Sequence, residues 1–378
     1  MNIALTALSC DNLTGIGRIV RSLASEFARA GHQTSVIAQH IDSLPPGVQS
    51  HALWKPPLSP ALARLIFARQ SRAVGIGARF DLIHTFGVGR GAQVVSAQSC
   101  HLAGMRARQR FSTGRLKRRG LGLFDRVALR DERALFEGPE TRLIIAVSRL
   151  VKAEITSFYQ VPESKIRVVP NGVHIPSGSI QLEERARRRS NFGAGEGDFL
   201  LLFVGNEFDR KGLQTAIEAV AFLGKPKLRL LVAGSDARGP YERRAGKLGV
   251  RDQIRFIGSV ASSENVYGCV DALVLPTYYE PFGMVITEAM ASGVPVVTSA
   301  KAGAVEELHH GTHGLYLQDP LSAEELSAQL TQLMNDSPLR ERLIHNGREA
   351  ALRFAWNRIA AETLAVYSEV NGSSRVQK

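Results

Sequence analysis

Short apolar runs alternate with segments of helical period along nearly the whole chain, and this alternation constrains the fold more than any other feature. The clearest run, Phe199–Val204, holds six apolar residues and ends at Gly205. Such a run is typical of a strand buried on both faces, as in a parallel sheet covered by helices. Similar runs at Ile3–Leu5, Thr34–Ala38 and Leu143–Ala146 predict further strands. The pattern therefore predicts an α/β fold.

The chain of 378 residues is long enough for two domains. The strand–helix rhythm occurs in both halves, and the stretch 174–197 between them is polar and contains several glycines and arginines. We predict two doubly wound, Rossmann-like domains, residues 1–175 and 176–355. Ligands are expected where the strands end at their carboxyl termini, facing a central cleft.

The composition indicates a soluble protein in a reducing compartment. Cys10, Cys100 and Cys269 are far apart and show no metal-binding spacing. The first residues lack the features of a signal peptide, and no apolar run approaches the ~18 residues needed to cross a bilayer. We therefore expect a cytoplasmic location.

Positive charge is concentrated in the first half of the chain. Residues 1–175 hold 24 Lys and Arg against 11 Asp and Glu, whereas the remainder holds 23 against 24. Within it, Arg106 to Arg119 contains seven Arg or Lys, no acid, and the apolar residues Phe111 and Leu116. This segment is either a solvated helix face or, as we favour, a contact with an anionic membrane surface. No recognisable nucleic-acid-binding module accompanies it, so we expect no nucleic-acid partner.

The stretch from Glu280 to Glu288 predicts a strand, a tight turn and a helix. Pro281 and Gly283 are turn residues, and they follow the apolar run Ala272–Pro276. A helix that starts here presents unsatisfied N–H groups to phosphate or sugar hydroxyls. The two carboxylates could accept hydrogen bonds from a sugar and a ribose. We expect Glu288 to lie about two turns into the helix. In the alternative interpretation, Glu280 is only a turn residue and Glu288 is an exposed helix charge.

Two glycine-containing segments also follow predicted strands. Gly15-Ile16-Gly17 lacks the third glycine of a dinucleotide fingerprint, so we expect these glycines to let a ligand or the facing domain approach the backbone. In the second half, Gly205 and Gly212 flank a loop that ends in Arg210-Lys211. Two cations at the end of a strand and before a helix could bind an anionic ligand. The alternative is a solvated charged pair.

Taken together, these segments resemble the retaining GT-B glycosyltransferases of glycosyltransferase family 4. The motifs in order are Gly15-Ile16-Gly17-Arg18, Pro170-Asn171-Gly172-Val173, Val204-Gly205 with Arg210-Lys211-Gly212, Phe256-Ile257-Gly258, and Glu280-Pro281-Phe282-Gly283 with Glu288-Ala289. The loop 205–212 and Ser337–Arg340 are also similar to those of lipopolysaccharide-core α-glucosyltransferases. The resemblance implies that residues 356–378 form a helix that crosses back to the first domain.

The resemblance also implies a role for each motif residue. Arg210 and Lys211 would bind the donor diphosphate, Glu288 the ribose, and Glu280 the donor sugar. The remaining donor-binding positions would be Gly15, Gly17, Gly205, Ile257, Phe282, Gly283, Met284 and Val285. His101 would lie near the reaction centre, with His84 as a second histidine candidate. Acceptor contacts would come from Asp11, Asn12, Arg18 and Gln98, the last at a position where relatives carry an Asp.

The implied activity is transfer of a hexose, with retention, from a UDP-sugar to a membrane-associated or phosphorylated glycan such as lipopolysaccharide core. It would take place at the inner face of the cytoplasmic membrane. No cofactor is implied, and the absence of Asp-x-Asp from the sequence agrees with a reaction that needs no metal. A UDP-sugar epimerase and a non-catalytic nucleotide-sugar-binding protein are the alternatives, whereas a phosphorylase would need a much longer chain.

Overall fold

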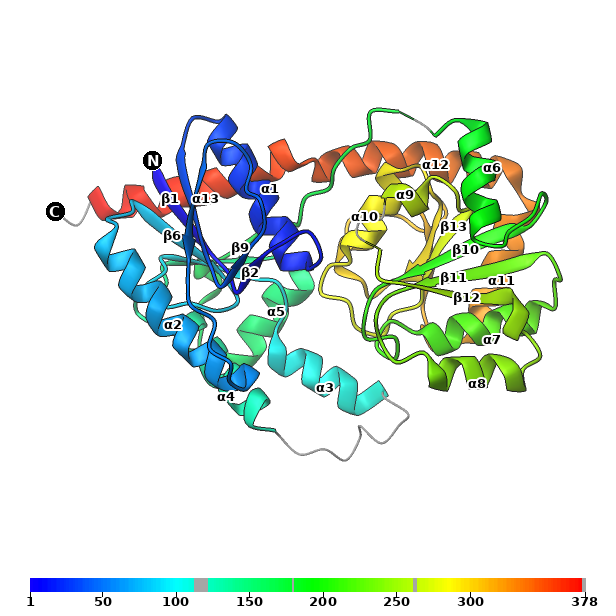
Figure 1. The fold of residues 1–378 in the computed structure, drawn as a ribbon, viewed down its shortest axis with the longest axis horizontal. Coiled ribbons are helices and arrows are strands. Elements are labelled where there is room, and N and C mark those ends of the chain that lie inside the picture. The colour runs from blue at the N-terminus through cyan, green and yellow to red at the C-terminus, as the bar shows by residue number, and fades with distance from the viewer. Residues whose placement is uncertain (112–121, 179, 261–263, 376–378) are drawn as a thin grey trace. The chain divides into compact units, whose positions relative to one another are not determined.

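The computed structural model describes residues 1–111, 122–178, 180–260 and 264–375, and it divides the chain into two compact units (Figure 1). The first unit contains Met1–Gly172 and the C-terminal segment from Trp356, and the second contains Val173–Ala355. The sequence analysis set the corresponding boundaries at 175/176 and 355/356.

A seven-stranded parallel sheet forms the centre of the first unit, with strand order β5-β3-β1-β6-β7-β8-β9. The order reverses between β1 and β6, which makes this pair the topological switch point of a doubly wound sheet. The strands are β1 (Asn2–Thr6), β3 (Gln33–Ala38), β5 (Val48–Ala52), β6 (Leu82–Phe86), β7 (Val94–Ala97), β8 (Leu143–Ala146) and β9 (Ile166–Val168). Two short strands, β2 (Ser9–Cys10) and β4 (His40–Ile41), pair separately.

The helices of the first unit lie on both faces of this sheet (Figure 1). They are α1 (Gly15–Arg29), α2 (Pro60–Gly77), α3 (His101–Phe111), α4 (Leu123–Phe136), α5 (Arg149–Phe158) and α13 (Trp356–Arg375). The α1 helix buries Ile19, Leu23 and Phe27 at helical spacing, as the sequence predicted. Ser148 caps α5, as expected, because its side chain accepts a hydrogen bond from the Val151 N–H at 3.2 Å.

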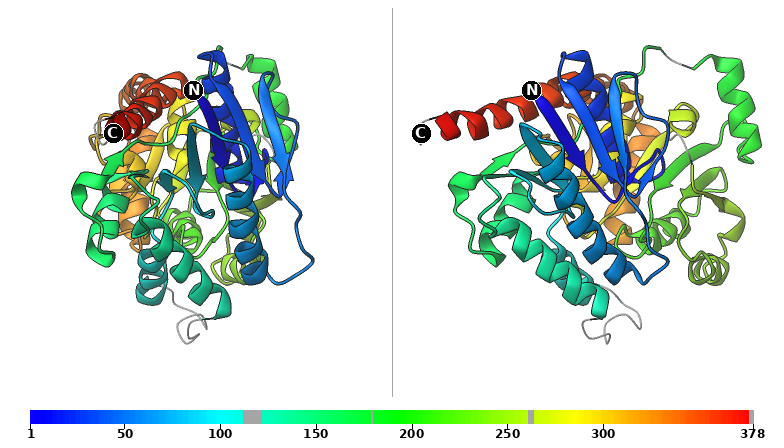
Figure 2. Two further views of the ribbon diagram at one scale, coloured as in Figure 1. Left: turned by 90° about the vertical axis from the view of Figure 1, so that its left-hand side faces the viewer. Right: turned by 60° about the vertical axis from the view of Figure 1, so that its left-hand side comes forward.

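Helix α13, red in Figure 2, packs beside α1 in the first unit. Its Tyr367 is fully buried between Phe27 and His84, and the Tyr367 hydroxyl lies 2.6 Å from His84 Nδ1. The other ring nitrogen, Nε2, lies 2.8 Å from the Ser96 hydroxyl. Burial lowers the pKa of His84 to about 3, so the ring is neutral at pH 7. His84 is therefore a core residue that holds the C-terminal helix, and its candidacy as a site residue is wrong.

The second unit is built on a six-stranded parallel sheet in the order β12-β11-β10-β13-β14-β15. The order reverses between β10 and β13, so this unit has the same doubly wound plan. The strands are β10 (Phe199–Val204), β11 (Leu228–Ala233), β12 (Ile254–Gly258), β13 (Ala272–Leu275), β14 (Val296–Ser299) and β15 (Leu315–Leu317). Its helices are α6 (Leu182–Asn191), α7 (Leu213–Leu223), α8 (Gly239–Lys247), α9 (Glu264–Tyr267), α10 (Met284–Ala291), α11 (Ala323–Asn335) and α12 (Ser337–Ala351).

Two local expectations need correction. Helix α10 begins at Met284, so Glu288 lies one turn into the helix and not two. Gly15 and Gly17 lie in the first turn of α1 and not in a loop. Within the residues that the structure describes, no helix is both long enough and apolar enough to span a membrane.

Candidate functional site

The loop after β10 owes its shape to two glycines. Gly205 has φ +137°, and a Cβ added there would lie 2.5 Å from Lys211 Cε. Gly212 has φ +79°, and its Cβ would lie 2.0 Å from the Pro276 carbonyl oxygen. A side chain at either position would displace Lys211 or separate the loop from the end of β13. The glycines therefore hold Arg210 and Lys211 at the switch point of the second sheet.

Glu280 follows β13 and meets these two cations. Lys211 Nζ donates to Glu280 Oε2 at 2.6 Å, and Arg210 Nη1 lies 3.4 Å from the same oxygen. Arg210 also donates to Glu207 Oε2 at 2.6 Å and to the Tyr279 carbonyl. Burial alone would raise the pKa of Glu280, but Lys211 and Arg210 outweigh it and hold that pKa below its usual value. A buried, charged cluster thus forms where the two strands end.

Backbone contacts fix the two loops to each other. The Arg210 carbonyl accepts from the Tyr278 N–H and from the Thr277 hydroxyl, both at 3.2 Å. Thr277 is fully buried, and its hydroxyl also lies 3.1 Å from the Tyr279 carbonyl. The cluster is therefore built on a rigid base, which is what a binding site for a specific ligand requires.

The turn from Glu280 to Met284 directs the start of α10. Gly283 has φ +96°, and a Cβ there would lie 2.9 Å from Ile286 Cδ1 and 3.0 Å from Glu280 Cγ. Phe282 is buried, whereas Met284 is partly exposed. The first N–H groups of a helix have no acceptor within it, so those of α10 can bind oxygen atoms of a ligand.

Glu288 is partly buried, and it does not extend freely into solvent as the alternative interpretation expected. Its Oε2 accepts a hydrogen bond from the Tyr267 hydroxyl at 3.1 Å, and Tyr267 itself is 1% exposed. Sequence reasoning missed Tyr267, because nothing in its spacing connects the short helix α9 with α10. The tyrosine limits the positions that the Glu288 carboxylate can adopt.

The remaining donor-binding candidates lie in both units. Ile257 lies on β12 and is partly buried, and Val285 is in the first turn of α10. Gly17 needs to be glycine because a Cβ would lie 2.6 Å from the backbone N and O of Asp11. The atoms that approach Gly17 there belong to a loop of its own unit. The approach of a ligand or of the facing domain to these glycines stays a prediction. Gly15 is exposed, and a Cβ there would meet open space.

His101 is the first residue of α3 and follows β7. Its backbone N–H donates to Glu132 Oε1 at 2.7 Å, and its ring Nε2 lies 3.3 Å from Asp125 Oδ1. Glu132 is 8% exposed, and it also accepts a hydrogen bond from the Tyr159 hydroxyl. Both acids come from α4, so this helix fixes the start of α3 and the histidine ring. Neither acid stands out in the sequence, because each is one of several charged residues on an amphipathic helix.

The acceptor candidates of the first unit lie in the loop after β2, in helix α1 and in the loop after β7. Gln98 Oε1 accepts from Asn171 Nδ2 at 2.8 Å, which joins the loops after β7 and β9. Asp11 is 5% exposed and accepts hydrogen bonds from the Ser9 hydroxyl and from the backbone of residues 13 and 14. Its carboxylate thus shapes its own loop. Asn12 is exposed and Arg18 is partly buried.

Part of the basic segment Arg106 to Arg119 lies outside the described residues, which stop at 111 and resume at 122. Within α3, the Arg106 guanidinium lies 4.4 Å from the centre of the Phe158 ring, and Arg106 remains exposed. Arg110 is also exposed. Nothing in these contacts tests membrane binding, which stays a prediction.

Family models match both halves of the chain. The model "Glycosyltransferase Family 4" matches residues 13–175, and "Glycosyl transferases group 1" matches residues 184–350. The chain is 33% identical over 228 residues to the lipopolysaccharide glucosyltransferase WaaG of Escherichia coli, covering 58% of this chain and 60% of that protein. The chain thus spans about 60% of the length of the curated relatives it matches at this identity.

Solved structures agree with this fold. The crystal structure of WaaG, a glycosyltransferase involved in lipopolysaccharide biosynthesis, superposes with a TM-score of 0.81 at 24% identity, covering 96% of this chain and 99% of that one. The Anabaena protein Alr3699/HepE in complex with UDP and glucose gives a TM-score of 0.76 at 18% identity, covering 97% and 99%. With both of its domains matched and its two doubly wound sheets in place, the chain belongs to the GT-B glycosyltransferases of family 4.

Proposed function

We propose that the chain is a retaining glycosyltransferase that moves a hexose from a UDP-sugar to a membrane-associated or phosphorylated glycan. The observation that carries the proposal is the cluster of Arg210, Lys211 and Glu280 at the switch point of the second sheet, with the start of α10 and Glu288 beside it. The relatives that match the chain carry glycosyltransferase names, which favours the transferase over the epimerase.

In this proposal Arg210 and Lys211 hold the donor diphosphate and stabilise the charge that develops as it leaves. Glu280 keeps both cations at one point, and its carboxylate with the first N–H groups of α10 binds hydroxyls of the donor sugar. Glu288, restrained by Tyr267, accepts hydrogen bonds from the ribose. Proximity and charge stabilisation then supply the rate enhancement.

Retention is consistent with a front-face displacement in which a phosphate oxygen takes the acceptor proton. No protein base is then required, and two fixed cations can replace a divalent metal at the diphosphate. His101, held by Asp125 and Glu132, is proposed to contact the donor sugar near the reaction centre. The anomeric configuration of the product, read by NMR, tests retention, and full activity in a chelator tests metal independence.

The acceptor is assigned to the first domain because that domain carries the positive charge excess. A phosphorylated glycan or an anionic membrane would complement it. The enzyme would then act in the cytoplasm at the inner face of the membrane, with Arg106 to Arg119 as a surface contact. Two observations support this acceptor and location: the excess of positive charge in residues 1–175, and the similarity of the chain to WaaG, which is named a lipopolysaccharide glucosyltransferase.

A thermal-shift screen against UDP-, GDP- and ADP-sugars tests the donor directly. A ligand that binds only the folded state stabilises it by RT ln(1 + L/Kd), where L is the free ligand concentration, so a tighter or more concentrated ligand raises the unfolding temperature further. We expect stabilisation by UDP-glucose or a related UDP-sugar, and none by the others at equal concentration. Stabilisation by no nucleotide sugar would refute the proposal.

A further inference from the structure

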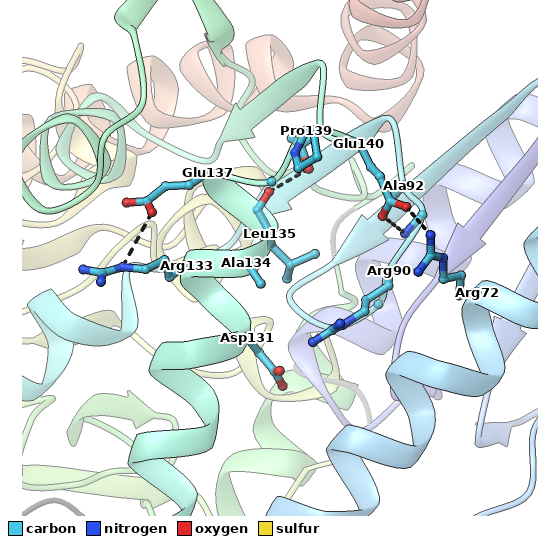
Figure 3. Close-up of a pocket in the computed structure, with 14 residues that line it drawn as sticks. Arg72, Arg90, Ala92, Asp131, Arg133, Ala134, Leu135, Glu137, Pro139 and Glu140 are labelled. Carbon is cyan, nitrogen blue, oxygen red and sulfur yellow. Dashed lines mark hydrogen bonds and ion pairs between the residues drawn. The ribbon is translucent and has the colours of Figure 1, made fainter.

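A pocket of about 420 Å³ opens in the first unit, mainly beside the amino ends of β7 and β8, although its lining residue Gly89 packs against Thr6 and Thr85 at the carboxyl ends of β1 and β6 (Figure 3). It is lined by α2, by the loop Gly89–Ala92 that leads into β7, by α4, and by the segment Glu137–Thr141 that leads into β8. Residues that precede parallel strands lie at the amino edge of the sheet, whereas His101 and Gln98 follow β7 at the carboxyl edge. The pocket volume falls within the usual range for small-molecule sites.

Most charges around this pocket already have partners. Arg72 donates to Glu140 Oε1 at 2.8 Å, and the Gly91 N–H donates to Glu140 Oε2 at 2.9 Å. Glu137 accepts from the Gln160 N–H at 3.0 Å. These acids are therefore neutralised or hydrogen-bonded without any ligand.

Two charged side chains that face the pocket have hydrogen-bonding groups without a partner in the described part of the chain. Arg90 is exposed and has no hydrogen bond or ion pair with any residue that the structure describes. Asp131 is 5% exposed; its Oδ2 accepts from Arg64 Nε at 3.0 Å, while its Oδ1 has no partner within the described part of the chain. Figure 3 shows the Arg90 guanidinium and the Asp131 carboxylate pointing toward one another across the pocket. Their separation exceeds that of an ion pair, since none forms between them.

We propose that this pocket binds a phosphorylated sugar. The guanidinium of Arg90 offers paired N–H donors that match a phosphate, and Asp131 Oδ1 can accept a hydrogen bond, which a sugar hydroxyl supplies. Ala92, Ala134 and Leu135 supply an apolar wall for the C–H face of the ring. Because the free acid oxygen and the free cation stand opposite each other, a ligand with an anionic group and a neighbouring hydroxyl fits better than a simple anion. This proposal does not rest on the proposed transferase activity.

Calorimetric titration of the full chain with glucose 6-phosphate tests the site. We expect saturable binding to the wild type and at least a tenfold loss of affinity in Arg90→Ala, as for one charge-assisted hydrogen-bonding group. Arg69→Ala is the matched control, because Arg69 is an exposed arginine of α2 that does not line the pocket. Inorganic phosphate should bind more weakly than the sugar phosphate, and glucose should not bind.

Lys211→Ala separates this pocket from the proposed donor site, where a sugar phosphate could also bind. Unchanged glucose 6-phosphate affinity in Lys211→Ala supports the pocket, whereas loss of binding in that variant places the ligand in the second unit and overturns the proposal. Equal affinity of wild type and Arg90→Ala overturns it as well, as does the absence of binding at about 10 mM ligand. Failure of the nucleotide-sugar screen would leave this test unaffected.

Discussion

Replacing Lys211 by Met should affect stability and donor binding in separable ways. Methionine keeps the length and apolar stem of the side chain but removes the ammonium that donates to Glu280 at 2.6 Å. Breaking a buried ion pair by removing one partner costs about 3–5 kcal/mol. Arg210, which lies 3.4 Å from the same Glu280 oxygen, remains in the variant, so we expect a loss below that range, about 2–3 kcal/mol.

Such a loss is easily measured. For a domain of the size of Val173–Ala355, 1 kcal/mol shifts the unfolding temperature by about 2–4 °C, so the second unit should melt about 4–12 °C lower. Lys225→Met, which changes an exposed lysine of the same unit, serves as the control and should melt like the wild type. Circular dichroism followed during heating gives both values.

The pH dependence of this loss follows from the Glu280 carboxylate. The pKa of Glu280 is lowered in the folded protein, so its contribution is present above its unfolded pKa and is lost as the pH falls through the folded pKa. Without Lys211, burial should raise that pKa. Near pH 4 the variant gains a proton on Glu280, and the difference in unfolding temperature from the wild type should become smaller than at pH 7.

The double variant Lys211→Met/Glu280→Gln distinguishes support of the fold from donor binding. Removing the orphaned carboxylate should return about 1–3 kcal/mol of the lost stability, because the two residues are in contact. UDP affinity, measured by calorimetry, should stay about 10- to 100-fold below that of the wild type, since the diphosphate has lost a cation. Wild-type UDP affinity in the double variant would refute a direct role of Lys211, and wild-type stability in the single variant would refute the buried ion pair.

Four further predictions concern residues outside this pair. Glu288→Ala should weaken UDP binding about tenfold through loss of its hydrogen bonds to the ribose, and unchanged affinity by calorimetry would contradict that role. His101→Ala should lower turnover, and Asp125→Asn should lower it less and add nothing in the His101→Ala background, as a double-mutant cycle of initial rates would show. The pKa of His84 is about 3 in the folded protein, so the unfolded chain binds the proton first as the pH falls from 6.5 to 3, and the protein loses about 1.4 kcal/mol of stability per pH unit. His84→Gln should remove this loss. Identical pH profiles of unfolding temperature in the wild type and the variant would disprove this. Neutralising the exposed or partly exposed arginines of α3, Arg106, Arg108 and Arg110, should reduce sedimentation of the protein with anionic liposomes while UDP affinity stays constant. Equal sedimentation of the variant and the wild type would exclude this helix as the membrane contact.

The sequence predicts the position of the charged cluster because topology determines it. Apolar runs identify β10 and β13, and the chain order makes them the neighbours at which a doubly wound sheet reverses. Polar residues that follow two such strands must then lie close together. Arg210-Lys211 and Glu280 are almost seventy residues apart in sequence; the family resemblance assigns them to one site, and the strand order places them in contact.

The supporting residues could not be predicted in the same way. Asp125, Glu132 and Tyr267 act through side-chain contacts across 21 to 31 residues, between helices that do not share a strand end. A lone tyrosine in a short helix and an acid on an amphipathic helix are common, so neither pattern indicates a role. The candidacy of His84 as a site residue is wrong for a related reason. Helix α13, whose Tyr367 is 283 residues further along the chain, buries its ring, and the sequence around His84 does not show this.

The charge balance of the cluster limits how a diphosphate can be recognised there. Arg210 and Lys211 are already paired with Glu207 and Glu280, so the group carries no excess positive charge in the absence of a ligand. Attraction must then come from the remaining N–H donors of Arg210 and Lys211 and from the start of α10. The Glu207 side chain is 50% exposed, whereas the Glu280 side chain is 9% exposed. Replacing the exposed Glu207 carboxylate at Arg210 by a phosphate oxygen therefore costs less free energy than displacing the buried Glu280 carboxylate. We infer that donor binding displaces Glu207 and leaves the Lys211–Glu280 pair intact.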